Sequence, residues 1–333
     1  MKKFCLLIAC FTLFVYRLNA QTIQIVEQGK PASIRGLSVV DDNVAWASGS
    51  RGYVAKSTDG GTSWAWKQVK GYEKADFRDI EAFSDKEAVI IASGTPALIL
   101  KTTDGGESWQ LKYNNADTTY FLDAMDFSTP QHGWVLGDPI NGKFLLMETN
   151  DGGNTWASRT DIAPAAATGE AAFAASGTCL RVVKNNLFIV TGGTVTHLIQ
   201  SANNGKQWQH QDIPVAHGQG AKGAFSLAVN GKDILITGGN YEKDKLTDSV
   251  ACYFQDKKWV LPATYPAGYQ SGAEHIKGST YLSTGTPGSN ITTDGGKTWK
   301  QIDATSFNVC RKARRGNLVL LAGNGGKIGI LKF

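Results

Sequence analysis

The chain has 333 residues, of which 42% are hydrophobic and 19% are charged, and its formal net charge is +5. This length allows a large core, and the modest charge, with acidic and basic residues interspersed, does not indicate a nucleic-acid-binding protein. The 38 glycines and the frequent aromatic residues, without a long run of helix formers, indicate one repetitive all-β domain.

The first 20 residues have the pattern of a secretory signal peptide. Lys2 and Lys3 precede an apolar run over residues 4–16, and the small residue Ala20 ends the segment. We expect cleavage after Ala20 and export to the periplasm or the medium. Lipid anchoring at Cys10 is an alternative, although the apolar run continues beyond that cysteine. No other segment approaches the ~20 apolar residues that span a membrane, so the mature chain is not expected to be transmembrane.

One eight-residue motif recurs along the chain. It reads STDGGTSW at 57–64, TTDGGESW at 102–109, TNDGGNTW at 149–156 and TTDGGKTW at 292–299, and a degenerate copy, SANNGKQW, lies at 201–208. The spacing of about 45 residues is typical of a four-stranded propeller blade. Division of the mature length by this spacing predicts a single β-propeller of about seven blades over residues 21–333.

The strands of the second repeat are expected at 78–83, 88–93, 97–102 and 109–113. After the last motif, strands are expected at 300–303, 307–312, 317–322 and 327–332. The final blade is then one strand short, whereas residues 22–27 precede the first blade and alternate apolar with polar side chains. We predict that residues 22–27 complete the last blade and close the ring, because closure removes exposed strand edges.

The repeated motif is predicted to stabilise the turn between the third and fourth strands of each blade. Asp side chains accept hydrogen bonds from turn amides, Gly adopts positive φ, and the Trp ring packs over the hairpin. We therefore assign a structural role, with no catalytic and no calcium-binding role, to the motif residues Asp59, Trp64, Asp104, Trp109, Asp151, Trp156, Asn203, Trp208, Asp294 and Trp299.

These residues are the Asp-box, or BNR, repeat, which is fairly specific for the propeller fold and poorly specific for function. With the Gly133-Trp134 pair before the third box, the chain resembles the photosystem II stability/assembly factor family of Ycf48-like propellers. It is more distantly similar to sialidase and sortilin-type propellers. The resemblance covers repeats one to three and six well. It implies a scaffold that binds another protein during assembly.

Propellers bind ligands at the mouth of the central channel, which is lined by inner strands and by loops between second and third strands. The candidate binding residues are Arg35, Arg51, Arg78, Asp79, Glu81, Asp123, Asp126, Asp138, Glu170, Tyr269, Glu274 and Arg311. One interpretation is a funnel that binds an acidic or polar ligand, and the other is an ion-pair ring that fixes the blade register. The small-residue segment 169–177 interrupts the repeat and suggests a close approach of chain or ligand there.

The sequence predicts an exported, non-catalytic binding protein that holds a protein or peptide of the cell envelope on its loop face. A small-molecule or glycan ligand is an alternative, and no nucleic-acid partner is expected. A sialidase-like glycoside hydrolase is the main alternative function, with Arg35, Arg78 and Arg311 on the substrate carboxylate and Tyr269 nearby.

An oxidoreductase, the label of some relatives, is a third reading of the function. The chain has no dinucleotide-binding glycine motif, no haem-attachment motif and no clustered metal ligands, so no cofactor or metal is expected. The mature chain keeps Cys179, Cys252 and Cys310, an odd number whose spacing fits neither a zinc site nor a disulfide scaffold.

Overall fold

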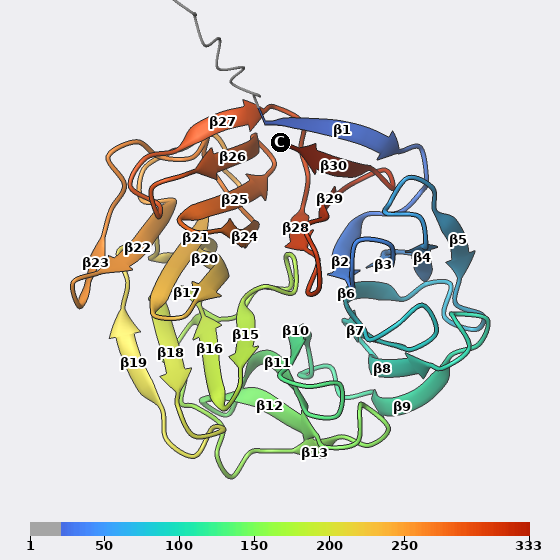
Figure 1. The fold of residues 1–333 in the computed structure, drawn as a ribbon. Coiled ribbons are helices and arrows are strands. Elements are labelled where there is room, and N and C mark those ends of the chain that lie inside the picture. Colours follow the sequence, from blue (N-terminus) through green and yellow to red (C-terminus); the bar gives the residue numbers. More distant parts are fainter. Residues whose placement is uncertain (1–20) are drawn as a thin grey trace, which may run out of the picture.

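A computed structural model describes residues 21–333, so the predicted signal peptide and Cys10 lie outside the described residues. The described chain forms seven β-sheets arranged as blades around a central axis, which Figure 1 shows from one end. Six sheets have four strands, and one is extended to six. The predicted all-β propeller and its seven blades are confirmed.

The first three blades follow the chain order without interruption. Blade 1 contains β2 (Ile34–Val39), β3 (Ala45–Gly49), β4 (Tyr53–Ser57) and β5 (Ala65–Gln68). Blade 2 contains β6 (Asp76–Ala82), β7 (Ala88–Ser93), β8 (Ala97–Thr102) and β9 (Gln110–Asn115). Blade 3 contains β10 (Leu122–Phe127), β11 (Gly133–Ile140), β12 (Lys143–Thr149) and β13 (Ala157–Ser158).

Blades 4 to 6 carry the degenerate repeats and one extension. Blade 4 contains β15 (Leu180–Val183), β16 (Asn186–Val190), β18 (His197–Ser201) and β19 (Gln209–Asp212). Blade 5 contains β20 (Gln219–Asn230), β21 (Asp233–Asn240), β22 (Ala251–Gln255) and β23 (Lys258–Val260), and β14 (Glu170–Ala171) and β17 (Gly192–Gly193) extend it. Blade 6 contains β24 (Gly272–Lys277), β25 (Thr280–Gly285), β26 (Gly288–Thr292) and β27 (Lys300–Asp303).

The last blade joins the two ends of the described chain. It contains β28 (Val309–Lys312), β29 (Val319–Ala322), β30 (Ile328–Lys332) and, as its outer strand, β1 (Thr22–Glu27). β1 pairs antiparallel with β30, with Thr22 opposite Lys332 and Ile25 opposite Gly329. Figure 1 shows the blue β1 beside the dark red β30. The predicted ring closure is confirmed, and it pairs the edge that β30 would otherwise expose.

Apolar side chains fill the space between neighbouring blades. Trp46 of blade 1 and Trp134 of blade 3 are almost fully buried. The indole Nε1 of Trp46 donates to the carbonyl of Ser84 in the next blade, at 2.9 Å. Each blade therefore buries its apolar face against the next, and the inner strands are held as a rigid wall around the channel.

The two ends of the channel are formed by different turns of the blades. The first-to-second strand turn and the Asp-box turn of a blade lie together, as shown by Gly60 N donating to Asn43 O and Gly105 N to Lys86 O, both at 2.9 Å. We call this end the box face. The opposite end, the loop face, carries the connections between blades and the loops between second and third strands, such as residues 94–96. Inner strands run from the loop face to the box face.

Candidate functional site

Each Asp-box carboxylate is engaged by its own turn. Asp104 Oδ1 accepts from Thr102 Oγ1 at 2.8 Å and from Ser108 N at 3.0 Å, and its Oδ2 accepts from Ser108 Oγ at 2.6 Å. These bonds, with that from the Ser108 hydroxyl the strongest, hold the pKa of Asp104 well below its usual range. Gly106 follows with φ 84°, and a Cβ there would lie 3.1 Å from the ring of Trp46.

The other boxes repeat these bonds. Asp59, Asp151 and Asp294 each accept from the hydroxyl two residues before and from the backbone amide four residues after. The degenerate copy keeps both contacts through the amide oxygen of Asn203. The geometry accounts for these side chains as hairpin caps, and it leaves them on the face away from the loop-face mouth.

A short segment enters the centre of the ring from the linker between β14 and β15. We call residues 172–178 the plug, and Figure 1 shows the lime-coloured chain before β15 reaching toward the middle. Ala175 O accepts from Arg35 Nη1 of blade 1 at 3.2 Å, and Ala174 O accepts from Arg78 Nη1 of blade 2 at 3.5 Å. Ser176 Oγ donates to the carbonyl of Ser271, beside blade 6, at 2.6 Å.

Only small residues fit where the plug crosses the channel. Gly177 has φ 68°, and a Cβ there would lie 2.2 Å from Cγ of Asp79. Phe173 is the exception, because it turns to blade 5 and stacks on Phe225 with ring centroids 3.9 Å apart. The small-residue segment of the sequence is therefore a close approach of the chain itself, which crosses the channel between the blades.

The loop-face mouth is formed by two arginines and a group of aromatic rings. Within residues 21–333 no carboxylate lies within ion-pair distance of Arg35, whose pKa is lowered by burial and then by the nearby Arg78. Arg78 Nε pairs with Asp76 at 2.8 Å, and the Arg78 guanidinium lies 5.8 Å from the Phe121 ring centroid. Arg35 therefore has a hydrogen bond to a backbone carbonyl and no ion pair, although the more distant charge of Asp76 favours its charged form.

The aromatic part of this mouth lies on blade 5 and on the connection to blade 6. Tyr269 packs edge-on against Phe225 with centroids 4.8 Å apart, and Tyr241 lies 6.5 Å from Tyr269. Tyr269 is buried, whereas Tyr241 is 50% exposed and Leu246, in the same loop, is 53% exposed. This loop, between β21 and β22, therefore offers apolar surface to solvent beside the mouth.

A groove of about 710 Å³ runs over the loop face of blade 2. It is lined by the connection 71–76, by residues 92–96, which include the cis peptide bond Thr95–Pro96, and by Leu98. Asp76 lines the groove and also pairs with Arg78, so the groove reaches the arginine side of the mouth.

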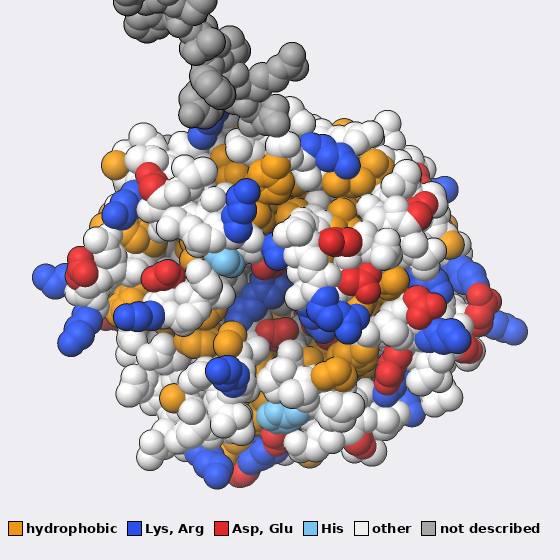
Figure 2. All heavy atoms as spheres, viewed as in Figure 1, with side chains coloured by type: hydrophobic (Ala, Val, Ile, Leu, Met, Phe, Trp, Pro, Cys, Tyr) orange, Lys and Arg blue, Asp and Glu red, His pale blue; other side chains and the backbone are white. Residues whose placement is uncertain are grey.

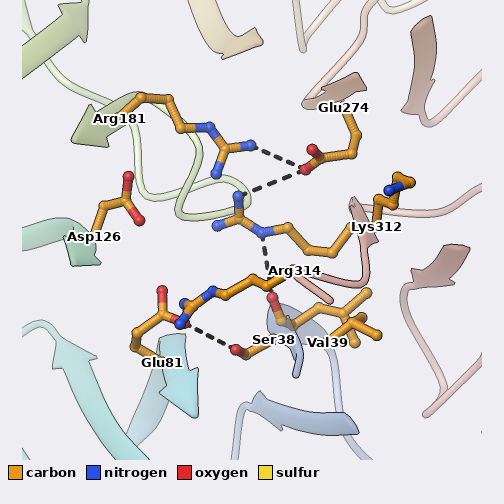
Figure 3. A pocket seen from close by; sticks show the side chains of 10 residues that line it. Ser38, Val39, Glu81, Asp126, Arg181, Glu274, Lys312 and Arg314 are labelled. Atoms are coloured by element: carbon orange, nitrogen blue, oxygen red, sulfur yellow. Dashed lines mark hydrogen bonds and ion pairs between the residues drawn. The ribbon is translucent and has the colours of Figure 1, made fainter. Parts of the chain in front are cut away.

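The box-face end of the channel is a pocket of about 100 Å³ with closely paired charges (Figure 3). Arg181 Nη2 pairs with Glu274 Oε2 at 3.2 Å, and Arg311 Nη1 lies 3.9 Å from the same oxygen. Arg314 pairs with Glu81, which also accepts from Ser38 Oγ at 2.9 Å. Figure 2 shows acidic and basic side chains together in a hollow at the middle of one face.

Burial shapes the protonation of this pocket. It raises the pKa of Glu274, against the opposing effect of Arg181, and it lowers the pKa of Arg314 to about 10. Asp126 accepts from the backbone amides of Val182 and Phe127 at 2.6 and 3.0 Å, and burial raises its pKa too. Most charged groups of this pocket are paired with one another, which agrees with the interpretation of an ion-pair ring.

The candidate binding residues inferred from the sequence do not meet in one site. Arg35, Arg78, Asp123, Asp138 and Tyr269 lie at the loop-face end, and Asp79 lies beside the plug. The box-face pocket is lined by Glu81, Asp126, Glu274 and Arg311. All four were expected at strand starts, but Glu81, Asp126 and Arg311 lie one residue before the ends of β6, β10 and β28, and Glu274 lies in the middle of β24.

Two further candidates lie away from the channel. Glu170 is buried between blades 4 and 5, where it accepts from Thr191 Oγ1 and contacts His197 Nδ1 at 2.8 Å. Arg51, at φ 60°, is exposed on the rim of blade 1. Both are therefore separate from the mouth formed by Arg35 and Arg78.

The structure adds residues that sequence reasoning missed. Arg181 and Arg314 complete the box-face pocket, and the groove over blade 2 was not anticipated. Arg181 could have been found as a charged residue within the short apolar segment 180–183. The fourth repeat is degenerate, however, so this segment was not identified as an inner strand.

The three arginines of the sialidase alternative are not brought together. Arg35 and Arg78 face the loop end, whereas Arg311 donates to Leu37 O and contacts Glu274 on the other side of the plug. Within residues 21–333 no group of three metal-ligating side chains is placed to hold an ion, and Cys179, Cys252 and Cys310 are buried and unpaired. Across the same residues, no helix has the length and apolarity to cross a membrane.

A family model described as photosynthesis system II assembly factor YCF48 matches residues 17–117 and 111–216. The chain belongs to this family. A BNR/Asp-box repeat model also matches residues 291–301, the last box. No curated protein matches the chain.

Solved structures agree with this fold. YCF48 bound to a D1 peptide superposes with a TM-score of 0.68 at 14% identity, over 96% of this chain and 97% of that one. YCF48 from Cyanidioschyzon merolae gives a TM-score of 0.60 at 15% identity, over 93% and 98%. A GH74 xyloglucanase from Xanthomonas campestris gives 0.60 at 14% identity, over 93% of this chain and 53% of that one. At these identities the superpositions establish the fold alone.

Proposed function

We propose that this YCF48-family propeller is an exported assembly-factor-like scaffold that holds an extended peptide segment of a cell-envelope protein on its loop face. The observation that carries the proposal is the loop-face mouth, where Arg35 has no carboxylate partner and exposed apolar side chains stand beside it. A structurally similar YCF48 has been solved with a peptide bound, which supports a peptide as the kind of partner.

The contacts suggest how a peptide is held. An acidic side chain of the peptide pairs with Arg35. The guanidinium is already positioned at the mouth, so pairing only exchanges its hydrogen bond to Ala175 O for a charge-assisted one. Apolar side chains of the peptide cover Tyr241 and Leu246, and its backbone continues along the groove of blade 2. Residues from blades 1, 2 and 5 then act together, so binding depends on the closed ring.

The test is crosslinking of the mature chain, residues 21–333, to its own envelope fraction, followed by titration of a synthetic peptide from the crosslinked segment. We expect the double variant Arg35→Ala/Arg78→Ala and the single variant Tyr241→Ala each to weaken binding about tenfold or more. The matched control is Arg315→Ala on the box face, whose side chain is 72% exposed, and it should bind as the wild type does. Equal binding by all variants would contradict the proposal.

Export is part of the proposal and rests on the signal-peptide pattern of residues 1–20. The test is cell fractionation with N-terminal sequencing of the recovered protein. We expect a mature N-terminus at Gln21 in the periplasm or medium. A cytoplasmic protein that retains its first 20 residues would contradict export, and a lipid-modified Cys10 would replace it with anchoring.

A further inference from the structure

The Asp-box turn of one blade packs against the second strand of the blade before it. A Cβ at Gly106, in the box of blade 2, would lie 3.1 Å from the ring of Trp46 in blade 1. A Cβ at Gly296, in the box of blade 6, would lie 2.8 Å from the side chain of Leu235 in blade 5. Where a box is present, it therefore covers this part of the preceding blade.

Blade 5 lacks a box, because only residues 256–257 join β22 to β23. The face of blade 4 that turns to blade 5 carries Arg181 and Phe188, which lie opposite each other, and Arg181 Nε donates to Leu227 O of blade 5 at 3.2 Å. On this face lies a pocket of about 240 Å³, lined by residues of blade 4 alone. The corresponding pocket between blades 1 and 2, which box residues 105–107 also line, has only about 70 Å³. The missing box therefore leaves the face of blade 4 open (blade 4 contains β16, β18 and β19 in Figure 1).

An aromatic ring and two amides form one row across this open face. Phe188 of β16 pairs with Gln200 of β18, as Trp46 pairs with Lys56 in blade 1. Gln200 pairs in turn with Gln209 of β19. Because directly opposite residues of neighbouring strands project from the same face of a sheet, the ring and both amides line the pocket together.

The rest of the lining is also rich in amides. The amide side chains of the pocket are Asn186, Gln200, Asn203, Gln207 and Gln209. Gln200 stands where blades 1 and 2 have a lysine, and Gln207 stands where the intact boxes have Ser or Thr. The hydrogen bonds among these amides are long, at 3.4 Å from Gln200 Nε2 to Gln209 Oε1 and 3.5 Å from Asn203 Nδ2 to Gln207 Oε1. Donors and acceptors therefore remain for a ligand.

This lining matches the chemistry of a neutral sugar. Each primary amide offers two N–H donors and a carbonyl acceptor, which suit adjacent hydroxyl groups, and an aromatic ring offers a flat apolar surface to the C–H face of a sugar ring. No Asp, Glu, Lys or Arg is among the lining residues, so a carboxylate or phosphate would lose hydration without gaining an ion pair. The volume lies below the about 300–1,000 Å³ of pockets for drug-sized ligands, which suits one sugar unit of a longer chain.

We propose that this blade 4 pocket binds a neutral sugar unit of an oligosaccharide or polysaccharide. The sugar ring stacks on Phe188, its hydroxyl groups exchange hydrogen bonds with Gln200 and Gln209, and the rest of the saccharide lies in solvent. Asn203 and Gln207 belong to the box turn of blade 4, so the pocket opens at the box-face edge of the ring. Saccharide binding there does not involve the loop-face mouth and does not depend on the proposed peptide partner.

The test is calorimetric titration of the mature chain, residues 21–333, with neutral tetrasaccharides of glucose, mannose and N-acetylglucosamine. We expect at least one of them to bind, and both Phe188→Ala and the double variant Gln200→Ala/Gln209→Ala to weaken that binding about tenfold or more. The matched control is Gln110→Ala. Gln110 is exposed and pairs with Lys101 in blade 2 as Gln209 pairs with Gln200, and its variant should bind as the wild type does.

Two comparison ligands test the chemistry of the site. Tetragalacturonate has the hydroxyl groups of a neutral sugar with added carboxylates, and adenosine can stack on Phe188 without being a saccharide. We expect both to bind at least tenfold more weakly than the neutral tetrasaccharide. Tighter binding of tetragalacturonate would contradict the selection for a neutral ligand, and tighter binding of adenosine would make the pocket a nucleoside site.

Two further results overturn the proposal: no binding of any of the neutral tetrasaccharides, or binding that is unchanged in the double glutamine variant. Phe188 also packs against the core, so folding of Phe188→Ala is checked by circular dichroism. Gln200 is partly buried and Gln209 is exposed, so the double variant makes the same comparison without disturbing the core. No peptide is present in these titrations, so their failure is distinguishable from failure of the proposed function.

Discussion

The two ends of the channel are built from the same inner strands but differ in how their charges are neutralised. At the box face, Glu274 is shared by Arg181 and Arg311, and Glu81 is paired with Arg314. At the loop face, Arg35 donates a hydrogen bond to a carbonyl of the plug and, among residues 21–333, forms no ion pair. A charge whose partner is built in contributes to stability, whereas a charge without one is available to a ligand. This difference underlies the proposal that one end of the channel contributes stability and the other binds a partner.

The largest expected effect is at the box face. Glu274→Ala leaves two guanidinium groups buried without their carboxylate, and the loss of one partner of a buried pair costs about 3–5 kcal/mol. We expect the free energy of unfolding, measured by urea denaturation, to fall by that amount. A loss below about 1 kcal/mol would show that the pocket charges are solvated, and the comparison between the two ends would fail.

The next effect concerns the pH dependence of stability at the loop face. Asp138 has its pKa raised to about 6 by burial, from an ordinary value of 3.8. Its contribution is fully present below about pH 4 and is lost as pH rises through about 6. We expect the wild type to lose about 2–3 kcal/mol more than Asp138→Asn over this interval. Parallel stability curves for the two proteins would contradict the burial of this carboxyl group.

A smaller effect is expected for Arg35→Ala. The variant loses one hydrogen bond to Ala175 O, but it also removes a cation whose pKa is lowered by burial and then by repulsion from Arg78. We expect the free energy of unfolding to change by less than about 1 kcal/mol in thermal or urea denaturation. A loss as large as that of Glu274→Ala would mean that Arg35 is a structural residue.

The smallest effect is expected at an Asp-box. Asp104→Ala removes the acceptor for Thr102 and Ser108, but the hairpin keeps its strand pairing and the packing of Trp109. We expect a slight fall in melting temperature, with peptide binding on the loop face unchanged. Loss of binding with an unchanged melting temperature would show that the box residues have a functional role.

The fold was predictable because one sequence motif recurs at a nearly regular spacing along most of the chain. Five motif copies placed the third-to-fourth strand turns, and the strand 22–27 could only be paired by closing the ring. The site was less predictable. Whether a residue faces the loop-face or the box-face end of the channel depends on its position between the start and the end of its inner strand. A bulge at Asp123 shifts the strand register by one residue, and the repeated sequence motif does not indicate such a shift.

The plug shows the same limit. The small residues of 169–177 indicated a close approach, but not that the segment contacts blades 1, 2, 5 and 6 at once. That arrangement depends on contacts across the ring, which no local pattern records. The lack of an ion pair at Arg35 could not be predicted for the same reason, because it depends on which side chains from distant parts of the sequence lie near this arginine.

The most direct test of the account compares peptide affinity for Arg35→Ala and for Arg314→Ala, one arginine from each end of the channel. The ligand is the synthetic peptide from the crosslinked partner segment, titrated by calorimetry at neutral pH. The account predicts that Arg35→Ala loses affinity while remaining nearly as stable as the wild type, and that Arg314→Ala is less stable but keeps its affinity. Loss of affinity in Arg314→Ala alone would contradict the assignment of binding to the loop face.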